Sequence, residues 1–276
     1  MGSLHGGDRV TDLDRMLDIA REAVSIGADL VRTSTPHEIR AKSDRDTVTE
    51  VDVKIEQEIH AYLRRMSPEI GFLGEESGPD PNCNKDIIWT LDPIDGTSNF
   101  AHGLPLCAVS LALVRNSVPV VGVIAAPFLG LHYSSVKGQG SYVNGDRMRP
   151  SRTGSLTEAI VSIGDYAVGI NAHDKNKLRL RLTALLAERV ERVRMFGSAA
   201  LDLVWVAEGR TDATIILANK PWDTAAGVLI AREAGAIVTD MRGSQHSFAS
   251  GETVAVCPGL ADELSRLIQE IDARTL

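Results

Sequence analysis

Acidic side chains stand in clusters at points where an expected strand or helix begins or ends. Two of the clusters follow short apolar runs, and the third opens an expected helix. Carboxylates that gather without a cation repel one another, so clusters brought together by the fold would indicate a bound metal ion. The clusters are Glu75 with Glu76, Asp92 with Asp95, and Asp223.

The second cluster has the arrangement of a magnesium site. Asp92 follows a buried apolar strand, and Pro93 is predicted to end that strand because it lacks an amide donor. Asp95 returns a second carboxylate, and the carbonyl group of Ile94 can face the same space. Two carboxylates and a carbonyl oxygen form an oxygen-only ligand set, which favours Mg²⁺ over Zn²⁺.

The residues that follow could bind an anion. Gly96 permits a tight bend, and Thr97 with Ser98 can begin a helix whose free amides attract a phosphate group. Taken alone, this segment is equally consistent with residues that only form a turn and cap a helix. Glu75 and Asp223 occupy similar positions at element ends, which favours the metal site.

These residue types indicate hydrolysis of a phosphomonoester. The dianion must be neutralised before water attacks in line, and paired Mg²⁺ ions stabilise both the attacking and the leaving oxygen. Glu75 is a suitable proton acceptor because it would contact that water. No covalent enzyme intermediate is required.

The first half of the chain is expected to pack two helices on a mainly antiparallel sheet. Apolar residues repeat at helical spacing over 12–32, and a second stripe begins near Thr49 and ends before Pro68. Thr49 with Asp52 resembles a capping box. Strands are predicted over 70–73, 87–91, 107–114, 118–125 and 131–136 and from Ser141, with a hairpin turn at Asn116-Ser117.

After residue 150 the pattern changes to alternating strands and helices, which is typical of an α/β layer. We therefore expect an N-terminal α+β lobe over 1–150 with most metal ligands, and a C-terminal α/β lobe over 151–276 that completes the site. Their boundary is placed in the polar segment 150–154. Strands are predicted over 160–163, 190–196, 213–217, 236–239 and 253–257, and helices over 177–189, 199–208, 224–234 and 260–271.

Composition and charge exclude several classes of protein. The 276 residues are 43% hydrophobic and 24% charged, which is typical of a globular chain and excludes disorder. The 29 basic and 37 acidic residues give a net charge of −8, which disfavours a nucleic acid polymer or an anionic membrane as partner. No run approaches the ~18 apolar residues of a membrane span. Three scattered cysteines, Cys83, Cys107 and Cys257, and an N-terminus without an apolar signal segment predict a cytoplasmic protein.

Several motifs, in this order along the chain, are together typical of one family. They are Asp-Thr-Val-Thr-Glu-Val-Asp at 46–52, Gly-Glu-Glu at 74–76, Asp-Pro-Ile-Asp-Gly-Thr-Ser-Asn-Phe at 92–100, Gly-Ser-Ala-Ala at 197–200, and Trp-Asp-Thr-Ala-Ala-Gly at 222–227. The chain on this basis resembles the inositol monophosphatase family of magnesium-dependent, lithium-sensitive phosphomonoesterases. The resemblance covers nearly the whole chain.

The resemblance implies a layered α-β-α-β-α sandwich of the inositol monophosphatase and fructose-1,6-bisphosphatase type. Such proteins are often homodimers, and their site lies between two lobes. The resemblance further implies two or three Mg²⁺ ions per site, with Glu76 flanking it. The first ion would be held by Glu75, Asp92 and the Ile94 carbonyl, and the second by Asp92, Asp95 and Asp223.

Roles around the phosphate also follow from the resemblance. Gly96 and Thr97 would bind the phosphate group, and Asp52 would form a hydrogen bond with Thr97 that helps to activate the water. Lys42 would lie on a loop near the metals, although a solvated surface lysine is an equal alternative. The leaving alcohol would contact Asp95, Gly197, Ser198, Ala199 and the segment around Ile216.

One position departs from the family pattern. Inositol-specific members have a glutamate seven residues before the metal-binding aspartate, where this chain has Ile216. Isoleucine cannot accept a hydrogen bond from a sugar hydroxyl, so inositol phosphate is not the expected preferred substrate. Sugar, histidinol and nucleoside phosphates all remain open. The alternative function is a catalytically silent protein that binds a phosphometabolite or regulates through the same fold.

Overall fold

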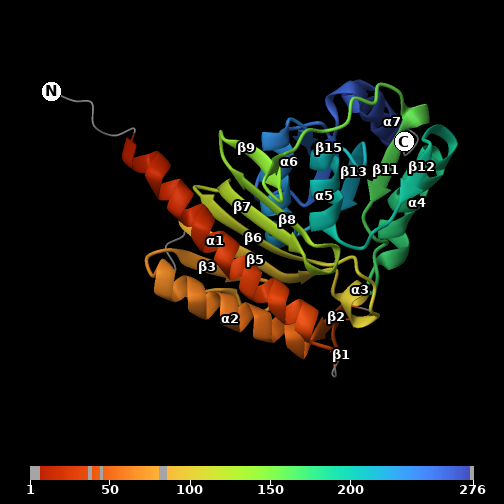
Figure 1. Cartoon of the computed structure of the whole chain (residues 1–276). Coiled ribbons are helices and arrows are strands. Elements are labelled where there is room, and N and C mark those ends of the chain that lie inside the picture. The colour runs from red at the N-terminus through yellow and green to blue at the C-terminus, as the bar shows by residue number, and fades with distance from the viewer. Residues whose placement is uncertain (1–6, 37–38, 44–45, 81–85, 274–276) are drawn as a thin grey trace.

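Helices and sheets alternate in five layers (Figure 1). The structure is a computed structural model that describes residues 7–273 apart from 37–38, 44–45 and 81–85. Two N-terminal helices cover one face of an eight-stranded sheet, and two further helices lie between this sheet and a five-stranded sheet. The helices over 172–189 and 261–273 cover the outer face of the second sheet. The predicted α-β-α-β-α sandwich is confirmed.

The first layer consists of α1 (Gly7–Thr33) and α2 (Glu50–Met66). Both predicted helices are confirmed, and their apolar stripes are buried against the eight-stranded sheet. Thr49 begins α2: its hydroxyl accepts a hydrogen bond from the amide of Val51 at 3.2 Å. The Asp52 carboxylate in turn accepts one from the amide of Thr49 at 2.9 Å, so the predicted capping box is present.

The first sheet contains β3 (Gly71–Gly74), β4 (Gly78–Pro79), β5 (Ile87–Asp95), β6 (Ala108–Arg115), β7 (Val118–Ala126), β8 (Leu131–Val136), β9 (Gly140–Val143) and β10 (Asp146–Arg147). Their order is β10-β9-β8-β7-β6-β5-β3-β4, and only the β3–β5 pair is parallel. The predicted hairpin turns at Asn116 and Ser117, whose φ values of 49° and 60° fit a type I′ turn. The mainly antiparallel sheet is thus confirmed.

Strand β5 continues through Pro93, so the prediction that Pro93 ends this strand is wrong. Asp92 pairs with Ser110 and Asp95 pairs with Ala108, which leaves one extra residue on β5 between the two pairs. Such a β-bulge accommodates the missing amide donor of proline and changes the direction in which the strand end points. Both carboxylates consequently stay in the sheet, at the C-terminal end of a buried strand.

The second sheet contains β11 (Ile160–Ile163), β12 (Arg192–Arg194), β13 (Ala213–Leu217), β14 (Ile237–Thr239) and β15 (Glu252–Val256). Their order is β12-β11-β13-β15-β14. β11 is parallel to both of its neighbours, whereas β15 is antiparallel to β13 and β14. The predicted strands are present, and the sheet that they form is mixed.

The helices of the second half occupy two layers. They are α4 (Ala172–Arg189), α5 (Ala199–Glu208), α6 (Pro221–Ala234) and α7 (Ala261–Ala273). α5 and α6 lie in the middle and contact both sheets. Gly122 on β7 permits a close approach of α6, because an added Cβ would lie 3.0 Å from the carbonyl oxygen of Ala226. The lobe boundary near 150–154 stays a prediction, since helices that follow it pack on the sheet that precedes it.

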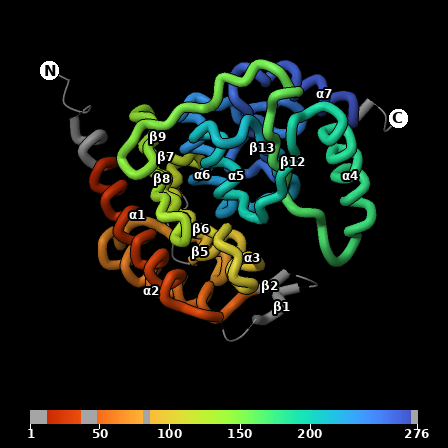
Figure 2. Tube along the Cα trace, turned by 45° about the vertical axis from the view of Figure 1, so that its right-hand side comes forward, coloured from red at the N-terminus to blue at the C-terminus, as the bar shows by residue number. Residues whose placement is uncertain are grey.

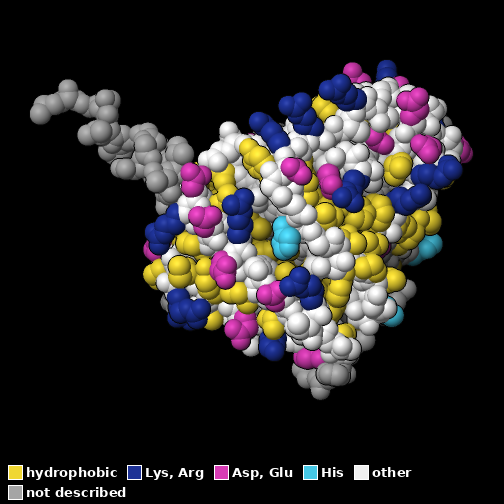
Figure 3. Space-filling model, in the orientation of Figure 1, with side chains coloured by type: hydrophobic (Ala, Val, Ile, Leu, Met, Phe, Trp, Pro, Cys, Tyr) yellow, Lys and Arg dark blue, Asp and Glu magenta, His cyan; other side chains and the backbone are white. Residues whose placement is uncertain are grey.

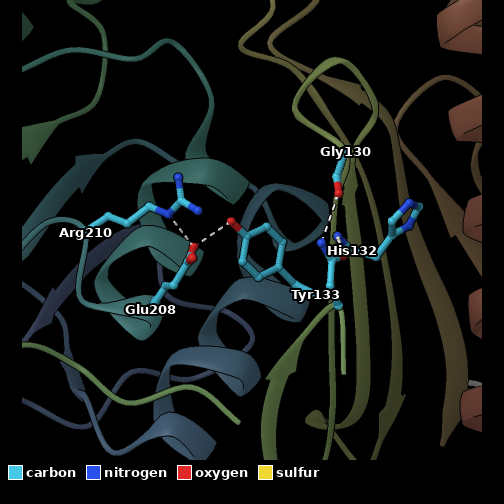
Figure 4. Close-up of polar contacts among 6 residues, drawn as sticks. Gly130, His132, Tyr133, Glu208 and Arg210 are labelled. Atoms are coloured by element: carbon cyan, nitrogen blue, oxygen red, sulfur yellow. Dashed lines mark hydrogen bonds and ion pairs between the residues drawn. The ribbon is translucent and has the colours of Figure 1, made fainter. Parts of the chain in front are cut away.

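A polar cluster joins the middle helices to the first sheet (Figure 4). The hydroxyl of Tyr133 on β8 donates a hydrogen bond to the carboxylate of Glu208 at 2.9 Å, and Arg210 forms an ion pair with the same carboxylate at 2.6 Å. Tyr133 is fully buried, and burial together with Glu208 raises the pKa of its hydroxyl. The buried Tyr133 hydroxyl thus has a hydrogen-bond partner at the end of α5, in the neighbouring layer, which offsets the free-energy cost of burying a polar group.

The remaining elements are short. They are β1 (Ile39–Ser43) and β2 (Asp46–Thr49), which form a two-stranded ribbon, α3 (Thr97–Ala101), and 3₁₀ turns at Pro127–Leu129, Leu156–Glu158 and Pro258–Leu260. Within the described residues, no helix combines the length and apolar character needed to cross a membrane. Cys107 and Cys257 are buried and free, whereas Cys83 lies outside the described residues.

Candidate active site

A cavity of about 470 Å³ lies where several element ends meet. It is bounded by the end of β5, the start of α3, the N-terminal ends of α5 and α6, the end of β13, and the loop 164–168 that precedes α4. Figure 2 shows the segment before α4 descending toward the side of the molecule where α3 lies. Both halves of the chain therefore contribute to one site.

Most of the site residues predicted from the sequence line this cavity. Asp52 does not border the cavity, but it accepts a hydrogen bond from Thr97, which does. Glu76 follows Glu75 in the turn after β3. Lys42 belongs to β1, but the structure does not describe the side chains of this strand. The predicted residues that line the cavity are Glu75, Asp92, Ile94, Asp95, Gly96, Thr97, Gly197, Ser198, Ala199, Ile216 and Asp223.

Asp92 is almost fully buried at the end of β5. It is 3% exposed, and its Oδ1 atom has no hydrogen-bond partner among the described residues. Burial raises the pKa of Asp92 well above its ordinary value, and the charges of Glu75, Asp95 and Asp223 raise it further. A hydrogen bond with the Glu75 side chain acts in the same direction. A cation at this position would relieve both the burial and the repulsion.

Asp95 joins β5 to the N-terminal end of α5. Its carboxylate accepts hydrogen bonds from the Ser198 hydroxyl, from the amide of Ala200 at 2.8 Å and from the amide of Ala199 at 3.2 Å. Burial raises the pKa of Asp95 to about 6 despite these hydrogen bonds, which lower it. Since α5 presents its unpaired amides at this end, the helix is a favourable partner for the carboxylate.

Asp223 lies in the first turn of α6. Its carboxylate accepts a hydrogen bond from the amide of Lys220 at 2.6 Å, which fixes the side chain at the helix start. Burial raises the pKa of Asp223 to about 7, with contributions from Asp95 and Glu75. Three elements, β5, the turn after β3, and α6, thus bring carboxylates close enough to perturb one another.

A hydrogen bond joins the side chains of Asp52 and Thr97, as the family resemblance predicts. The Thr97 hydroxyl lies 2.9 Å from Oδ1 of Asp52 and 2.9 Å from the carbonyl oxygen of Ile94. It has a single proton, so it donates to one of these acceptors at a time. Asp52 is fully buried, and burial raises its pKa although the bonds from Thr49 and Thr97 lower it. The contact orients the Thr97 oxygen at the edge of the cavity.

Glu56 is a positioning residue that sequence reasoning missed. Its carboxylate accepts hydrogen bonds from the amides of Glu76 at 2.9 Å and Ser77 at 2.7 Å, and so holds the turn that carries Glu75. It is 4% exposed on α2. One signal could have revealed it: Asp52 and Glu56 lie one helical turn apart within the apolar stripe, where two buried carboxylates need partners.

The wall opposite the acidic residues also went unpredicted. It contains the loop residues Asp165 and Tyr166 and the α4 residues Lys175 and Arg179. Asp202 on α5 also borders the cavity; it is 1% exposed, and burial raises its pKa well above the ordinary value. These residues belong to no local motif, and they border the cavity only because segments distant in the sequence pack together.

Several other glycine, tryptophan and histidine residues lie away from the cavity. Gly138 and Gly140 lie in the β8–β9 turn, and both of their amides donate to the Glu233 carboxylate, at 2.8 and 3.0 Å. This turn is therefore not a nucleotide-binding loop. Trp205 is 9% exposed in the core between the sheets and contacts Phe196 edge-on. His132 lies beside Tyr133 on β8, away from the site (Figure 4).

The carboxylates of Asp92, Asp95 and Asp223 lie near one another but do not surround a common position. Within the described residues, no three His, Cys, Asp or Glu side chains stand as a group that could enclose a metal ion. Asp95 and Asp223 are turned toward backbone amides, and Asp92 is bonded to Glu75. Small side-chain rotations would be needed for all of them to reach one ion, so the ligand set stays a prediction.

Comparison with known proteins agrees with this geometry. The chain matches the inositol monophosphatase family over residues 12–275. It is 39% identical over 218 residues to an inositol-1-monophosphatase of Mesorhizobium japonicum, covering 79% of this chain and 81% of that protein. It is 34% identical over 262 residues to the Nus factor SuhB of Escherichia coli, covering 91% and 97%.

Solved structures show the same likeness. An IMPase of Thermotoga maritima superimposes with a TM-score of 0.85 and 31% identity, covering 94% of this chain and 98% of that one. The fold and the acidic cavity define a phosphoric monoester hydrolase. The chain belongs to the inositol monophosphatase family, and the prediction made from its motifs is confirmed.

The Glu56→Gln variant tests how the turn after β3 is held. An amide in place of one carboxylate oxygen would face a backbone N–H, so we expect kcat for a generic phosphomonoester to fall about tenfold with KM little changed. Glu58→Gln, on the exposed side of the same helix, is the matched control. Equal kcat values for the two variants would contradict the positioning role.

The carboxyl pKa values predict how stability of the metal-free protein depends on pH. Asp95 and Asp223 have raised pKa values of about 6 and about 7, so the folded state binds protons more tightly than the unfolded state. Stability is therefore lost as pH rises through these values, and Tm in EDTA should fall between about pH 6.5 and about pH 8. The buried His246, whose pKa is lowered to about 4, is neutral in the folded state across this range, and it opposes the fall only weakly, while the unfolded state loses its last imidazole protons above the ordinary pKa of about 6.5.

Added Mg²⁺ should raise Tm more at the upper end of this range than at the lower end, because it binds the ionised carboxylates of the folded state. Asp223→Asn removes one titrating group and should flatten the pH dependence in EDTA. A wild-type Tm that stays constant or rises across the range would show that these carboxylates do not titrate as described.

Proposed function

We propose that this protein is a magnesium-dependent phosphatase that releases inorganic phosphate from a small phosphomonoester by attack of water. The observation that carries the proposal is Asp92, buried at the end of β5 with an unpartnered Oδ1 among the described residues. Its neighbours Glu75, Asp95 and Asp223 are themselves carboxylates. An unsatisfied buried oxygen in such surroundings is costly unless a cation is present.

The donor set fits Mg²⁺, which prefers oxygen ligands. Glu75, Asp92 and the carbonyl oxygen of Ile94 would hold one ion, and Asp92, Asp95 and Asp223 a second, with two or three ions per site. Asp95 accepts three hydrogen bonds, which leaves one of its roughly four acceptor positions for a metal. The family is generally magnesium dependent. When bound, such ions neutralise phosphate charge and lower the pKa of water.

Gly96 and Thr97 would bind the phosphate group through their backbone amides. Gly96 has φ of 90°, in the left-handed region, and an added Cβ would lie 2.9 Å from the carbonyl oxygen of Leu106. The position therefore requires glycine. Because Gly96 has no side chain, a phosphate group could approach its backbone amide closely.

Two carboxyl groups would control the proton of the attacking water. Asp52 accepts a hydrogen bond from the Thr97 hydroxyl, so the Thr97 oxygen could accept a hydrogen bond from the water. Glu75 also borders the cavity, and its carboxylate would take the proton as water attacks phosphorus. The leaving oxygen would then contact the segment formed by Asp95, Gly197, Ser198 and Ala199.

The substrate is proposed to differ from inositol phosphate. Ile216 is 6% exposed, borders the cavity and packs against Gly164. It therefore presents an apolar surface where inositol-specific relatives would place a carboxylate. Loss of a charge-assisted hydrogen bond of about 1.5–3 kcal/mol corresponds to a relative preference of about 10- to 150-fold. A sugar, histidinol or nucleoside phosphate would then be favoured.

We further propose a cytoplasmic homodimer that does not bind a nucleic acid polymer. On the face shown in Figure 3, basic and acidic side chains are interspersed instead of forming one large basic area. This distribution, together with the net charge of −8, supports a small-molecule substrate. The homodimer rests on the family resemblance alone.

A catalytically silent or regulatory role is the second candidate. The observation that favours it is the relationship to a protein named Nus factor SuhB. A silent protein would be expected to lose a predicted ligand or the Thr97 hydroxyl, whereas this chain retains Glu75, Asp92, Asp223 and Thr97. Retention of the whole set favours the enzyme.

Phosphate release from a broad panel of phosphomonoesters, with and without Mg²⁺, tests the proposal. Asp92→Asn and Asp223→Asn should each lower kcat by about 100-fold or more while leaving the fold intact, because each removes charge from a proposed ligand. Asp174→Asn, in an exposed ion pair with Lys177, is the control and should keep full activity. Near-normal turnover by Asp92→Asn at saturating Mg²⁺ would refute the ligand assignment.

Ile216→Glu tests the wall that meets the leaving group. The added carboxylate should raise kcat/KM for inositol 1-phosphate relative to less hydroxylated substrates by about tenfold. Ile216→Gln adds a polar group of similar size without charge and separates charge from polarity. An unchanged ratio in Ile216→Glu would mean that another residue contacts the sugar hydroxyls. A wild-type kcat/KM that is highest for inositol 1-phosphate would contradict the proposed preference.

A further inference from the structure

A second cavity of about 330 Å³ borders α6 and shares no lining residue with the catalytic cavity. It is formed by the turn between β6 and β7, the residue that follows β8, residues of α6, and the segment 245–248 between β14 and β15. Thr224 on α6 borders the second cavity, whereas the preceding residue, Asp223, borders the catalytic one. The second cavity is therefore a separate site in contact with the same helix.

The charged side chains that line the second cavity are basic. They belong to Lys137 and Arg232, and none of the other lining residues is acidic. Among the described residues, neither of the two has a carboxylate as an ion-pair partner. Two cations in an acid-free lining, within a chain whose net charge is −8, favour an anionic ligand at this place.

Part of the Arg232 guanidinium group has no protein partner. Its Nη2 donates to the carbonyl oxygen of His246 at 2.7 Å and to that of Val238 at 3.4 Å. Within the described part of the chain, Nε and Nη1 have no hydrogen-bond partner, and neither atom is fully enclosed. Burial lowers the pKa of Arg232, as expected for a cation without a compensating carboxylate. Carbonyl groups thus hold the side chain while two donor atoms stay accessible.

A buried chain of hydrogen bonds leads from the second cavity into the protein. Nε2 of His246, which lines this cavity, lies 2.8 Å from the Thr253 hydroxyl, and that hydroxyl lies 3.0 Å from Oδ1 of Asn219. The amide nitrogen of the Asn219 side chain donates to the carbonyl oxygen of Ser250 at 2.9 Å, which fixes the orientation of the amide. All three linked side chains are buried.

This chain determines which nitrogen of His246 carries the proton. Oδ1 of Asn219 is only an acceptor, so the single proton of Thr253 is donated to it. The Thr253 oxygen then accepts from Nε2 of His246, which must carry the imidazole proton. Burial and the charge of Arg232 lower the pKa of His246 to about 4, so the ring is neutral at pH 7.

Nδ1 of His246 is consequently an acceptor. It has no hydrogen-bond partner among the described residues, and it is not one of the fully enclosed polar atoms that lack a partner. Since His246 lines the second cavity and is 5% exposed, a ligand there can satisfy Nδ1 only with a hydroxyl or an N–H group.

Apolar side chains cover much of the remaining lining. Val118 is 41% exposed beside the β6–β7 turn, and Phe248 packs against the core between the two sheets. An apolar group of a ligand would remove this surface from water. The volume is at the lower end of the range of small-molecule sites. The apolar lining residues are Val118, Pro119, Ala225, Val228 and Phe248.

We propose that the second cavity binds a small organic anion that carries an apolar group and a hydrogen-bond donor. The anionic group, a carboxylate or a phosphate, binds Lys137 and Arg232, and the donor binds Nδ1 of His246. Thr253 is a positioning residue, because it keeps the imidazole proton on Nε2. The inference goes beyond the proposed phosphatase activity and does not depend on it, since no proposed metal ligand lines this cavity.

Calorimetric titration of the metal-free protein in EDTA tests the site, because the catalytic cavity then keeps its uncompensated carboxylates and repels anions. The anionic probes are 3-phenyllactate and 1-hydroxy-2-phenylethylphosphonate, and 3-phenylpropane-1,2-diol is the uncharged analogue. The Kd of the tighter anion should be at least about tenfold below that of the diol. Lactate, which lacks the phenyl group, should bind at least about tenfold more weakly than phenyllactate. The tighter of the two anions distinguishes a carboxylate from a phosphate group.

Lys137→Gln should raise the Kd of the tighter anion about threefold and leave that of the diol unchanged. The matched control is Arg242→Gln, which removes one positive charge from an exposed residue that precedes His246 but does not line the cavity. It should keep both Kd values. Arg232→Lys, checked by its Tm, retains the charge without the guanidinium donors and should also raise the Kd of the anion.

The methyl ether of phenyllactate, 2-methoxy-3-phenylpropanoate, tests the contact with His246. It can accept a hydrogen bond but cannot donate one, so its Kd should exceed that of phenyllactate at least about fivefold. Thr253→Val releases the imidazole proton to Nδ1, which can then donate to the ether oxygen, and this ratio of Kd values should fall at least about threefold.

Two variants serve as controls for Thr253→Val. Thr253→Ser retains the hydroxyl and should keep the wild-type ratio. Thr214→Val makes the same change at a buried residue of β13 whose hydroxyl has no partner among the described residues and which lines neither cavity, so it should also keep the ratio.

Each part of the proposal has an outcome that would overturn it. No saturable binding of any anion, or equal Kd values for the anions and the diol, would overturn the site. Equal effects of Lys137→Gln and Arg242→Gln would show a general effect of net charge and would overturn the contact with Lys137. A ratio that Thr253→Val leaves unchanged, or that falls equally in Thr214→Val, would overturn the contact with His246. Phosphate release is measured separately, so failure of the phosphatase activity is distinguishable from failure of this site.

Discussion

Burial of several like charges at one sheet edge is the constraint on which the rest of the site depends. Asp92 is almost fully enclosed, and the carboxylates around it raise its pKa in addition to the effect of burial. The fold opposes this repulsion by orienting the other acids with backbone amides: those at the start of α5 hold Asp95, and the amide of Lys220 holds Asp223. What remains uncompensated is the carboxyl group of Asp92, which a divalent cation would satisfy.

The same constraint explains why the site lies between two sheets. Helix starts supply free N–H groups that satisfy buried carboxylates, and the middle layer supplies two such starts, at α5 and α6. The helix α2 on the opposite side of the first sheet contributes Asp52 and Glu56, whose buried carboxylates orient Thr97 and the turn that carries Glu75. The acidic residues of the cavity are thereby held from both faces of the first sheet, and Lys175 and Arg179 of α4 border the same cavity.

Much of this arrangement was predictable from the sequence. Helical spacing of apolar residues located α1 and α2, and Thr49 with Asp52 predicted the cap that begins α2. Alternation and turn residues located the β6–β7 hairpin with its turn at Asn116. The acidic clusters indicated a hard-cation site, and most residues predicted for it do border one cavity. These features depend on neighbours along the chain, so local patterns are sufficient to reveal them.

The sequence by itself determined the elements, the family and the set of acids; the tertiary structure decided where they point and what faces them. Pro93 stays inside β5 because pairing with β6 tolerates a bulge, and this pairing outweighs the local tendency of proline to end a strand. Glu56 becomes a support of the site only when α2 packs beside β3. Lys175 and Arg179 border the same cavity as Asp92 and Asp95, which lie about eighty residues earlier in the chain, and Asp223, which lies later. Such contacts depend on the packing of distant segments, and no local pattern encodes that packing.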